Sequence, residues 1–237
     1  MRKAKMRNDA VELGGELVPL EVQVNGRARN ISLRVDERTG GLELVLPRFV
    51  PKAEGLAFIE EKSGWILSQL RDLPPRVPFV HGAVIPLLGT EHEIVHHDGA
   101  RGTVWIDAGR RTINVAGASP HVARRVTDWL KAQARHEVSA RAHRAATQLS
   151  KQIRKIQIRD TRSRWGSCSE DARLSFSWRL MLAPQHVLDY VVAHEVAHLV
   201  ELNHSPRFWR LVDTLCPGCG PAKYWLKRHG ATLHRFG

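Results

Sequence analysis

The sequence has few cysteines and no long uninterrupted apolar segment. Its three cysteines among 237 residues are too few for a disulfide framework. No apolar run approaches the roughly 20 residues that cross a bilayer, which argues against a membrane-spanning helix. The basic start of the chain leads into Asn8, Asp9 and Glu12 rather than into an apolar segment, so no signal peptide is recognised. We therefore expect a cytoplasmic protein.

The cysteines also fall short of a complete metal-binding motif. Cys216 and Cys219 would form half of a zinc ribbon, and Cys168 is too distant in sequence to complete the usual spacing. We interpret the Cys-Pro-Gly-Cys segment as a turn that ends a helix, with a metal or redox site as the alternative. Cys168 could be a nucleophile with a histidine as its base, although nothing in the sequence fixes that geometry.

Positive charge is in clear excess. The chain has 36 lysines and arginines against 24 acidic residues, a formal net charge of +12. This balance is compatible with nucleic acid, nucleotides or acidic proteins as partners, and equally with a solvated arginine-rich surface. The hydrophobic content of 43% is ordinary for a soluble globular protein and is sufficient for a core.

The first half of the chain is predicted to be rich in β-structure. Residues 1–16 are expected to be a flexible tail. Residues 17–118 are expected to form a β-rich region with one helix, at about 51–73, because alternating apolar residues are separated by turn signals. The Asn-Gly pair at 25–26 suggests a hairpin, so the first strands are predicted to form a meander. No internal repeat stands out.

Residues 119–237 are predicted to form the functional domain. A long helix at about 119–150 has an arginine-rich outer face, which is interpreted as solvated, with a phosphate-binding face as the alternative. Alternating apolar residues around 155–180 predict a hairpin whose edge could accept an extended peptide as an added strand. Helices then follow to the end of the sequence. The fold class is therefore expected to be α+β.

The segment at 191–204 contains the pattern His-Glu-x-x-His. On a helix from about 184 to 203, His194 and His198 lie one turn apart on the same face and can bind one metal ion. Glu195 points about 100° away, where its carboxylate can accept a proton from an activated water molecule. The neighbouring residues are apolar nearly all round the helix, which indicates a buried segment whose polar groups need partners.

The third ligand is expected to come from the corner that follows this helix. His204 precedes Ser205-Pro206, which we interpret as the N-cap and first residue of the next helix. Three histidines would leave the fourth position of a catalytic zinc ion for water. Glu201 is the competing third ligand, but it lies about 10 Å along the helix from His194, so convergence on one ion would be awkward.

Several motifs together resemble the YgjP-like, SprT-related metallopeptidase family. They are Arg-Trp-Gly-Ser-Cys-Ser at 164–169, the strand at 174–180, the histidine helix at 189–198 and Asn-His-Ser-Pro-Arg-Phe-Trp at 203–209. The resemblance implies a zincin-like domain made of a long helix, a β-hairpin, a metal helix and two C-terminal helices. It also implies zinc bound by His194, His198 and His204, with Glu195 as the catalytic acid and base.

Two departures limit this resemblance. The spacing from His198 to His204 equals that of the metzincins, but Glu201 stands where their glycine would be. The SprT branch often adds a C-terminal zinc ribbon that is missing here, so a role in DNA repair is not carried over.

The leading hypothesis is a zinc-dependent hydrolase that cleaves peptide bonds in a protein or peptide substrate. Arg164, Ser167 and Arg179, in and after the hairpin, are expected to contact the substrate. One alternative is a metal-dependent phosphohydrolase of nucleotides, since the same activated water could attack phosphorus and nearby arginines would suit an anion. The other alternative is a basic nucleic-acid-binding module with structural zinc, although such sites usually have four protein ligands.

Overall fold

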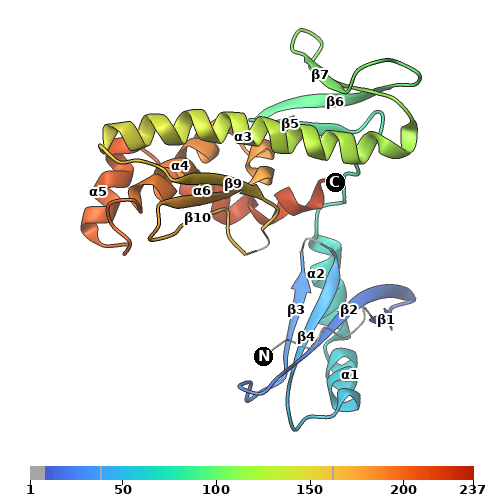
Figure 1. The fold of residues 1–237 in the computed structure, drawn as a ribbon. Helices are drawn as coiled ribbons and strands as arrows, with labels where there is room; N and C mark the ends of the chain where they lie inside the picture. Colours follow the sequence, from blue (N-terminus) through green and yellow to red (C-terminus); the bar gives the residue numbers. More distant parts are fainter. Residues whose placement is uncertain (1–8, 38, 162) are drawn as a thin grey trace. The chain divides into compact units, whose positions relative to one another are not determined.

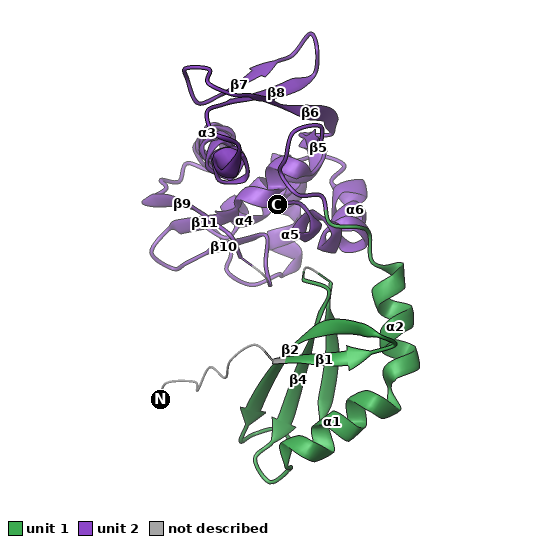
Figure 2. Ribbon diagram, turned by 90° about the vertical axis from the view of Figure 1, so that its right-hand side faces the viewer, with its two compact units in different colours: residues 1–76 green, residues 77–237 purple. Residues whose placement is uncertain are grey.

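The computed structural model describes residues 9–37, 39–161 and 163–237, which form two compact units divided after Arg76 (Figure 2). The predicted boundary at 118/119 differs from this division. The strands at 84–116 share a core with the long helix that follows them, since buried Ile94 and Val115 belong to the same cluster as Val126. A boundary at 118/119 would cut through that core.

The first unit is a four-stranded sheet covered by two helices. Its order is β1-β2-β4-β3, with β2 and β4 parallel and the other neighbours antiparallel. The helices supply buried Ile59 and Ile66 to a core with the leucines of β4. The elements are β1 Asp9–Leu13, β2 Glu16–Asn25, β3 Ser32–Asp36, β4 Gly41–Pro47, α1 Lys52–Glu61 and α2 Ser63–Asp72.

Three predictions for this unit need correction. Residues 9–13 of the expected tail form β1, which pairs with β2 across a turn at Gly14 and Gly15, both with positive φ; residues 1–8 lie outside the described part. The expected single helix is interrupted at Lys62. The strands do not form a meander, because the most apolar strand, β4, takes a central position and displaces β3 to the edge.

The second unit begins with a sheet of the same topology. Its order, β5-β6-β8-β7, again has one parallel pair, β6 with β8, between two antiparallel pairs. A long helix, α3, then follows and packs on the sheet (Figure 1). The bounds are β5 Val84–Leu87, β6 Thr90–His97, β7 Val104–Asp107, β8 Thr112–Ala116 and α3 Val122–Gln148. The same strand arrangement therefore occurs twice in the chain. No sequence pattern revealed this repeat, because two sheets of the same topology need similar alternation of apolar residues but not the same residues.

The rest of the second unit holds the histidine motif. A three-stranded sheet has the order β10-β11-β9, with β10 antiparallel and β9 parallel to β11. The predicted strand around 174–180 ends at Ser177, and Trp178–Leu182 form a 3-10 helix instead. The bounds are β9 Lys155–Arg159, β10 Gly166–Cys168, β11 Arg173–Ser177, α4 Gln185–Ala197, α5 Pro206–Leu215, α6 Gly220–His229 and a closing 3-10 helix Ala231–Arg235.

The fold is α+β, as expected. The predicted succession of long helix, hairpin, histidine helix and two C-terminal helices is found in α3, β10–β11, α4, α5 and α6. The hairpin is shorter than predicted, because residues 155–159 form β9, which pairs parallel to β11 and is therefore not a hairpin strand. Buried side chains along α3 and α4, such as Leu130 and Val187, join both helices in one core. Among the helices of the described part, none is long and apolar enough to cross a membrane.

Candidate metal centre

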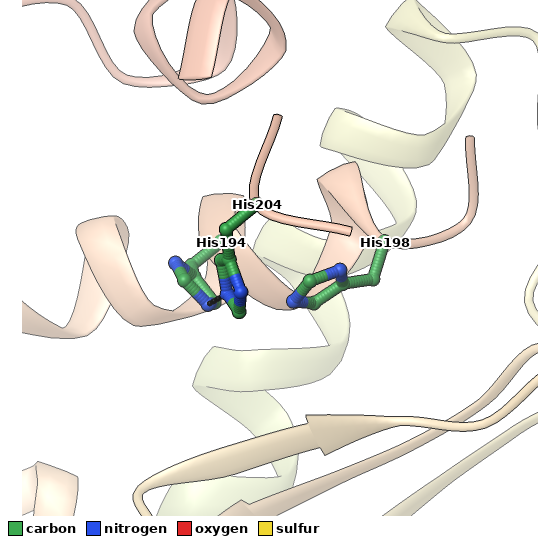
Figure 3. A group of neighbouring side chains, drawn as sticks. All are labelled: His194, His198 and His204. Carbon is green, nitrogen blue, oxygen red and sulfur yellow. Dashed lines mark hydrogen bonds between the residues drawn. The ribbon is translucent and has the colours of Figure 1, made fainter. Parts of the chain in front are cut away.

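Three histidine side chains converge at the end of α4 (Figure 3). His194 lies in the last turn of α4, His198 follows the helix as its C-cap, and His204 belongs to the connection to α5. One nitrogen of each ring can be chosen so that all three lie within 4.8 Å of one another. The Nε2 atoms of His194 and His204 are 3.1 Å apart. The structure thus brings the three predicted ligands together.

The helix that carries this site is shorter than predicted. It ends at Ala197 rather than near Asn203, because the chain tightens into turns in which Leu199 and Val200 donate to carbonyls three residues back. These turns lead the chain away from the helix axis. His204 can therefore return toward His194, which a helix continuing to Asn203 would have prevented.

A main-chain hydrogen bond orients His198. Its Nδ1 lies 3.0 Å from the carbonyl oxygen of Glu201. A carbonyl can only accept, so Nδ1 carries the proton and Nε2 keeps the lone pair that binds a metal. Glu201 therefore contributes through its backbone, and its carboxylate is not part of the histidine group found among the described residues.

The start of α5 supports the same cluster. The Ser205 hydroxyl accepts a hydrogen bond from the Phe208 amide at 3.3 Å, as expected for an N-cap. The buried Phe208 ring then lies against all three imidazoles, with centroid distances of 4.9 Å to His194, 4.5 Å to His198 and 4.8 Å to His204. The sequence analysis assigned no role in the site to Phe208. The available signal was the Ser205 N-cap, which places Phe208 in the first turn of the helix that follows His204.

The electrostatics of the cluster favour neutral imidazoles. Burial, together with His198, His204 and Lys223, lowers the pKa of His194 to about 4. Burial also lowers the pKa of His198. The hydrogen bond to the Glu201 carbonyl raises this pKa, and the charge of His204 lowers it further. Neutral rings offer lone pairs at pH 7, and an all-nitrogen donor set of three imidazoles is one that zinc accepts. The residues present therefore fit a bound divalent metal ion.

Glu195 is buried between α4 and β10. Only 6% of the residue is exposed, and burial raises the pKa of its carboxyl to about 7 although nearby Arg164 opposes the shift. The side chain lies directly on Gly166, where a Cβ atom would be 2.5 Å from Cγ and 2.6 Å from Oε1 of Glu195. The glycine of the Trp-Gly-Ser-Cys motif therefore makes room for this carboxylate.

A pocket of about 240 Å³ opens beside Glu195 and His194. It lies between the start of β10, helix α4 and helix α6, so groups from three elements can contact a bound molecule. Burial raises the pKa of Tyr190, one of its lining residues, and therefore keeps that hydroxyl protonated. The lining residues are Arg164, Trp165, Gly166, Tyr190, Val191, His194, Glu195 and Leu226.

The three expected substrate contacts have different surroundings. Arg164 lines the pocket. Ser167 pairs with Ser175 inside the hairpin and is not a lining residue, so its role stays a prediction. Arg179 is 8% exposed and binds Asp160 through Nε at 2.8 Å. Its Nη1 also donates to the carbonyls of Leu233 and Phe236. We therefore correct the expectation that Arg179 contacts the substrate. Its guanidinium binds the C-terminal segment of the second unit instead.

The cysteines do not join the site. Burial, with a smaller contribution from Glu195, raises the pKa of Cys168 to about 11, so its thiol stays protonated and is a poor nucleophile. Cys216 and Cys219 flank the turn between α5 and α6, where Gly218 has φ of 71°. The interpretation of this segment as a helix-ending turn is confirmed.

Three comparisons relate this chain to known proteins. A search of curated proteins found no match. The crystal structure of the metallopeptidase zymogen of Pyrococcus abyssi abylysin is 25% identical, with 42% of this chain and 97% of that chain covered at a TM-score of 0.36. A family model described as YgjP-like, metallopeptidase domain, matches residues 29–229. This match covers most of both compact units, and the chain belongs to the YgjP-like metallopeptidase family.

Proposed function

We propose that this metallopeptidase uses zinc held by His194, His198 and His204, with Glu195 as its acid and base. The observation that carries the proposal is the convergence of three imidazoles next to a buried carboxylate. Zinc bound there would polarise a substrate carbonyl and lower the pKa of water toward ~7. Three protein ligands leave a position open for this chemistry.

Glu195 is suited to move a proton in both directions. With a pKa of about 7, its carboxylate can accept a proton from the attacking water and, as the acid, donate it to the leaving nitrogen. The backbone of Gly166 packs against one side of the carboxylate, so the position of the carboxylate does not depend on a flexible side chain there. Burial excludes bulk water from this exchange.

The pocket and the adjoining strand would bind and orient the substrate. Tyr190 keeps a protonated hydroxyl that can donate to a substrate oxygen, and Arg164 offers a positive charge at the pocket wall. Strand β10 is an edge of its sheet and contains Gly166, which contacts Glu195. An extended peptide that pairs with this edge would bring its backbone next to the acid and base.

A phosphohydrolase acting on nucleotides is the second candidate. Two cations favour it. Arg164 lines the pocket, and the Nζ of Lys223 lies 4.3 Å from the centroid of the Trp209 ring, where its charge helps to lower the pKa of His194. Both would suit phosphate oxygens. A structural zinc site in a nucleic-acid-binding module is less favoured, because the described cluster has three ligands rather than four.

The test combines metal analysis with hydrolysis assays. Purified wild-type protein should contain close to one zinc per chain, His198→Ala should lose it, and Glu195→Gln should retain it but lose activity. His136→Ala, an exposed histidine on α3, is the matched control and should keep both. Denatured protein and nucleoside triphosphates are compared as substrates. Hydrolysis that survives in Glu195→Gln would contradict the assignment, and cleavage of triphosphates alone would select the second candidate.

A further inference from the structure

A second strand edge lies on the opposite side of the three-stranded sheet from the active site. Strand β9 pairs with β11 on one side, and no strand of the described part pairs with its other side. A groove of about 390 Å³ runs along it, lined by all five residues of β9 and by Arg135 from α3. Strand β10, which contacts Glu195, forms the other edge, with β11 between them. The groove is therefore separate from the metal centre.

The groove presents positive charge without nearby compensation. Arg135, Lys155 and Arg159 are all exposed, and the lining includes no acidic residue. In the described part of the chain, no carboxylate forms an ion pair with any of the three. The Nη2 of Arg159 donates to the side-chain oxygen of Gln157 at 2.7 Å, which leaves the charge itself unpaired.

Carboxylates close to the groove in sequence are already engaged by other cations. Asp160, the residue after β9, binds Arg179. Glu137, two residues after Arg135, binds Arg141. Across the second unit, twenty-three lysines and arginines face thirteen acidic residues, so the excess of positive charge is concentrated on this unit. A binding partner for the groove must therefore bring its own negative charge.

The shape of the groove selects the form of that partner. An edge strand presents alternate N–H and C=O groups that an extended chain can pair with. Lys155 and Arg159 stand at alternate positions of β9, with Gln157 between them, about 7 Å per two residues. Acidic side chains at every second position of an added strand would match this spacing. None of the lining residues is aromatic, so the groove has no platform for stacking the bases of single-stranded nucleic acid.

We propose that the groove beside β9 is a docking site for an extended acidic segment of a partner protein, which adds to β9 as a further strand. The same cations repel a second copy of β9, as charges on natural edge strands do, so the edge is closed to self-pairing but open to an acidic strand. The inference concerns binding alone, and it does not depend on the metal or on hydrolysis.

Fluorescence anisotropy with a labelled peptide of alternating glutamate and valine tests the proposal. The full-length protein should bind this peptide, and binding should weaken at least about tenfold when the glutamates are replaced by glutamine. Two further peptides carry N-methyl groups on every second backbone nitrogen, one peptide for each of the two possible registers. One of the two should bind about as weakly as the glutamine peptide, because methylation removes the strand hydrogen bonds. These comparisons change only the peptide, so they need no protein variant.

Charge reversal in the protein locates the site. The triple variant Arg135→Glu, Lys155→Glu, Arg159→Glu should lose binding, as should the milder triple glutamine variant. Arg101→Glu, Arg110→Glu, Arg124→Glu carries the same change of net charge at exposed positions away from β9 and should retain binding. Equal losses in both glutamate triples, unchanged binding of both N-methylated peptides, or displacement of the peptide by single-stranded DNA at equal concentration would each overturn the proposal.

Discussion

Gly166 and Glu195 are in contact across the boundary between β10 and α4, with no room for a side chain at the glycine. A Cβ at position 166 would lie 2.7 Å from the carboxyl carbon of Glu195, well inside van der Waals contact. Helix α4 and the hairpin therefore fix each other's position at the carboxylate. This relationship gives the Trp-Gly-Ser-Cys motif a physical role in the proposed mechanism.

Substitution Gly166→Ala should displace the Glu195 carboxylate. We expect kcat for peptide hydrolysis to fall about 100-fold, since a misplacement of ~1 Å can cost that much, while zinc content stays unchanged. Steady-state kinetics and metal analysis would check this. Gly220→Ala is the matched control, because a Cβ there meets no atom within 4 Å. Equal kcat in Gly166→Ala and wild type would contradict the role of the contact.

Metal binding should stabilise the fold through the three histidines. Zinc at about 100 times its dissociation constant adds ~2.7 kcal/mol to the free energy of unfolding. The Tm should therefore rise by several degrees on adding zinc and fall after chelation. His204→Ala should abolish most of this shift by removing one ligand, and differential scanning calorimetry would measure it. A full zinc shift in His204→Ala would restore Glu201 as the third ligand.

The local parts of this site could be predicted from the sequence. His194, Glu195 and His198 follow from helical periodicity, and Ser205 was recognisable as an N-cap because both its acceptor and its donor lie within one helical turn. The end of α4 could not be placed, because it depends on how the turns after Ala197 return the chain toward the other imidazoles. Local pattern placed His194 and His198 on one face of a helix but did not give the path of the chain from there to His204.

Long-range contacts were the part that sequence reasoning could not supply. Arg179 was interpreted as a substrate contact because it lies near the hairpin, yet its partners include carbonyls 54 and 57 residues away. The contact of Gly166 with Glu195 likewise joins segments that only the tertiary fold brings together. The order of strands is likewise a long-range property, because the pairing of β4 with both β2 and β3 is set by the tertiary fold.

The pH dependence of stability of the metal-free protein should reveal opposing contributions from Glu195 and the histidines. The raised pKa of Glu195, about 7 against 4.5, means that the folded state holds a proton that the unfolded state loses, so stability falls as pH rises from about 4.5 to 7. The lowered pKa of His194, about 4 against 6.5, acts in the opposite sense, so stability rises with pH from about 4 to 6.5. Between pH 4.5 and 6.5 the contribution of Glu195 opposes that of His194, and the lowered pKa of His198 acts in the same sense as that of His194.

Glu195→Gln should remove one side of this balance. Between pH 4.5 and 6.5 the free energy of unfolding of the metal-free variant should then rise more than that of the wild type, by on the order of 2 kcal/mol. Urea unfolding at several pH values in the presence of a chelator would measure the difference. The same change of stability with pH in both proteins would show that burial of Glu195 does not raise its pKa.

Arg164 and Arg179 should separate cleanly into a substrate contact and a structural contact. Arg179→Ala leaves the Asp160 carboxylate and the carbonyls of Leu233 and Phe236 without their donor, so the free energy of unfolding should fall by about 3 kcal/mol. Arg164 lines the pocket beside Glu195, so Arg164→Ala should raise KM or lower kcat while stability changes by less than about 1 kcal/mol. Urea titration and kinetics on both variants would measure the two effects.

Arg179→Lys should restore only part of the stability that Arg179→Ala loses, because an ammonium cannot reproduce the paired guanidinium contacts with Asp160. A stable Arg179→Ala protein with a raised KM would return this arginine to the substrate site.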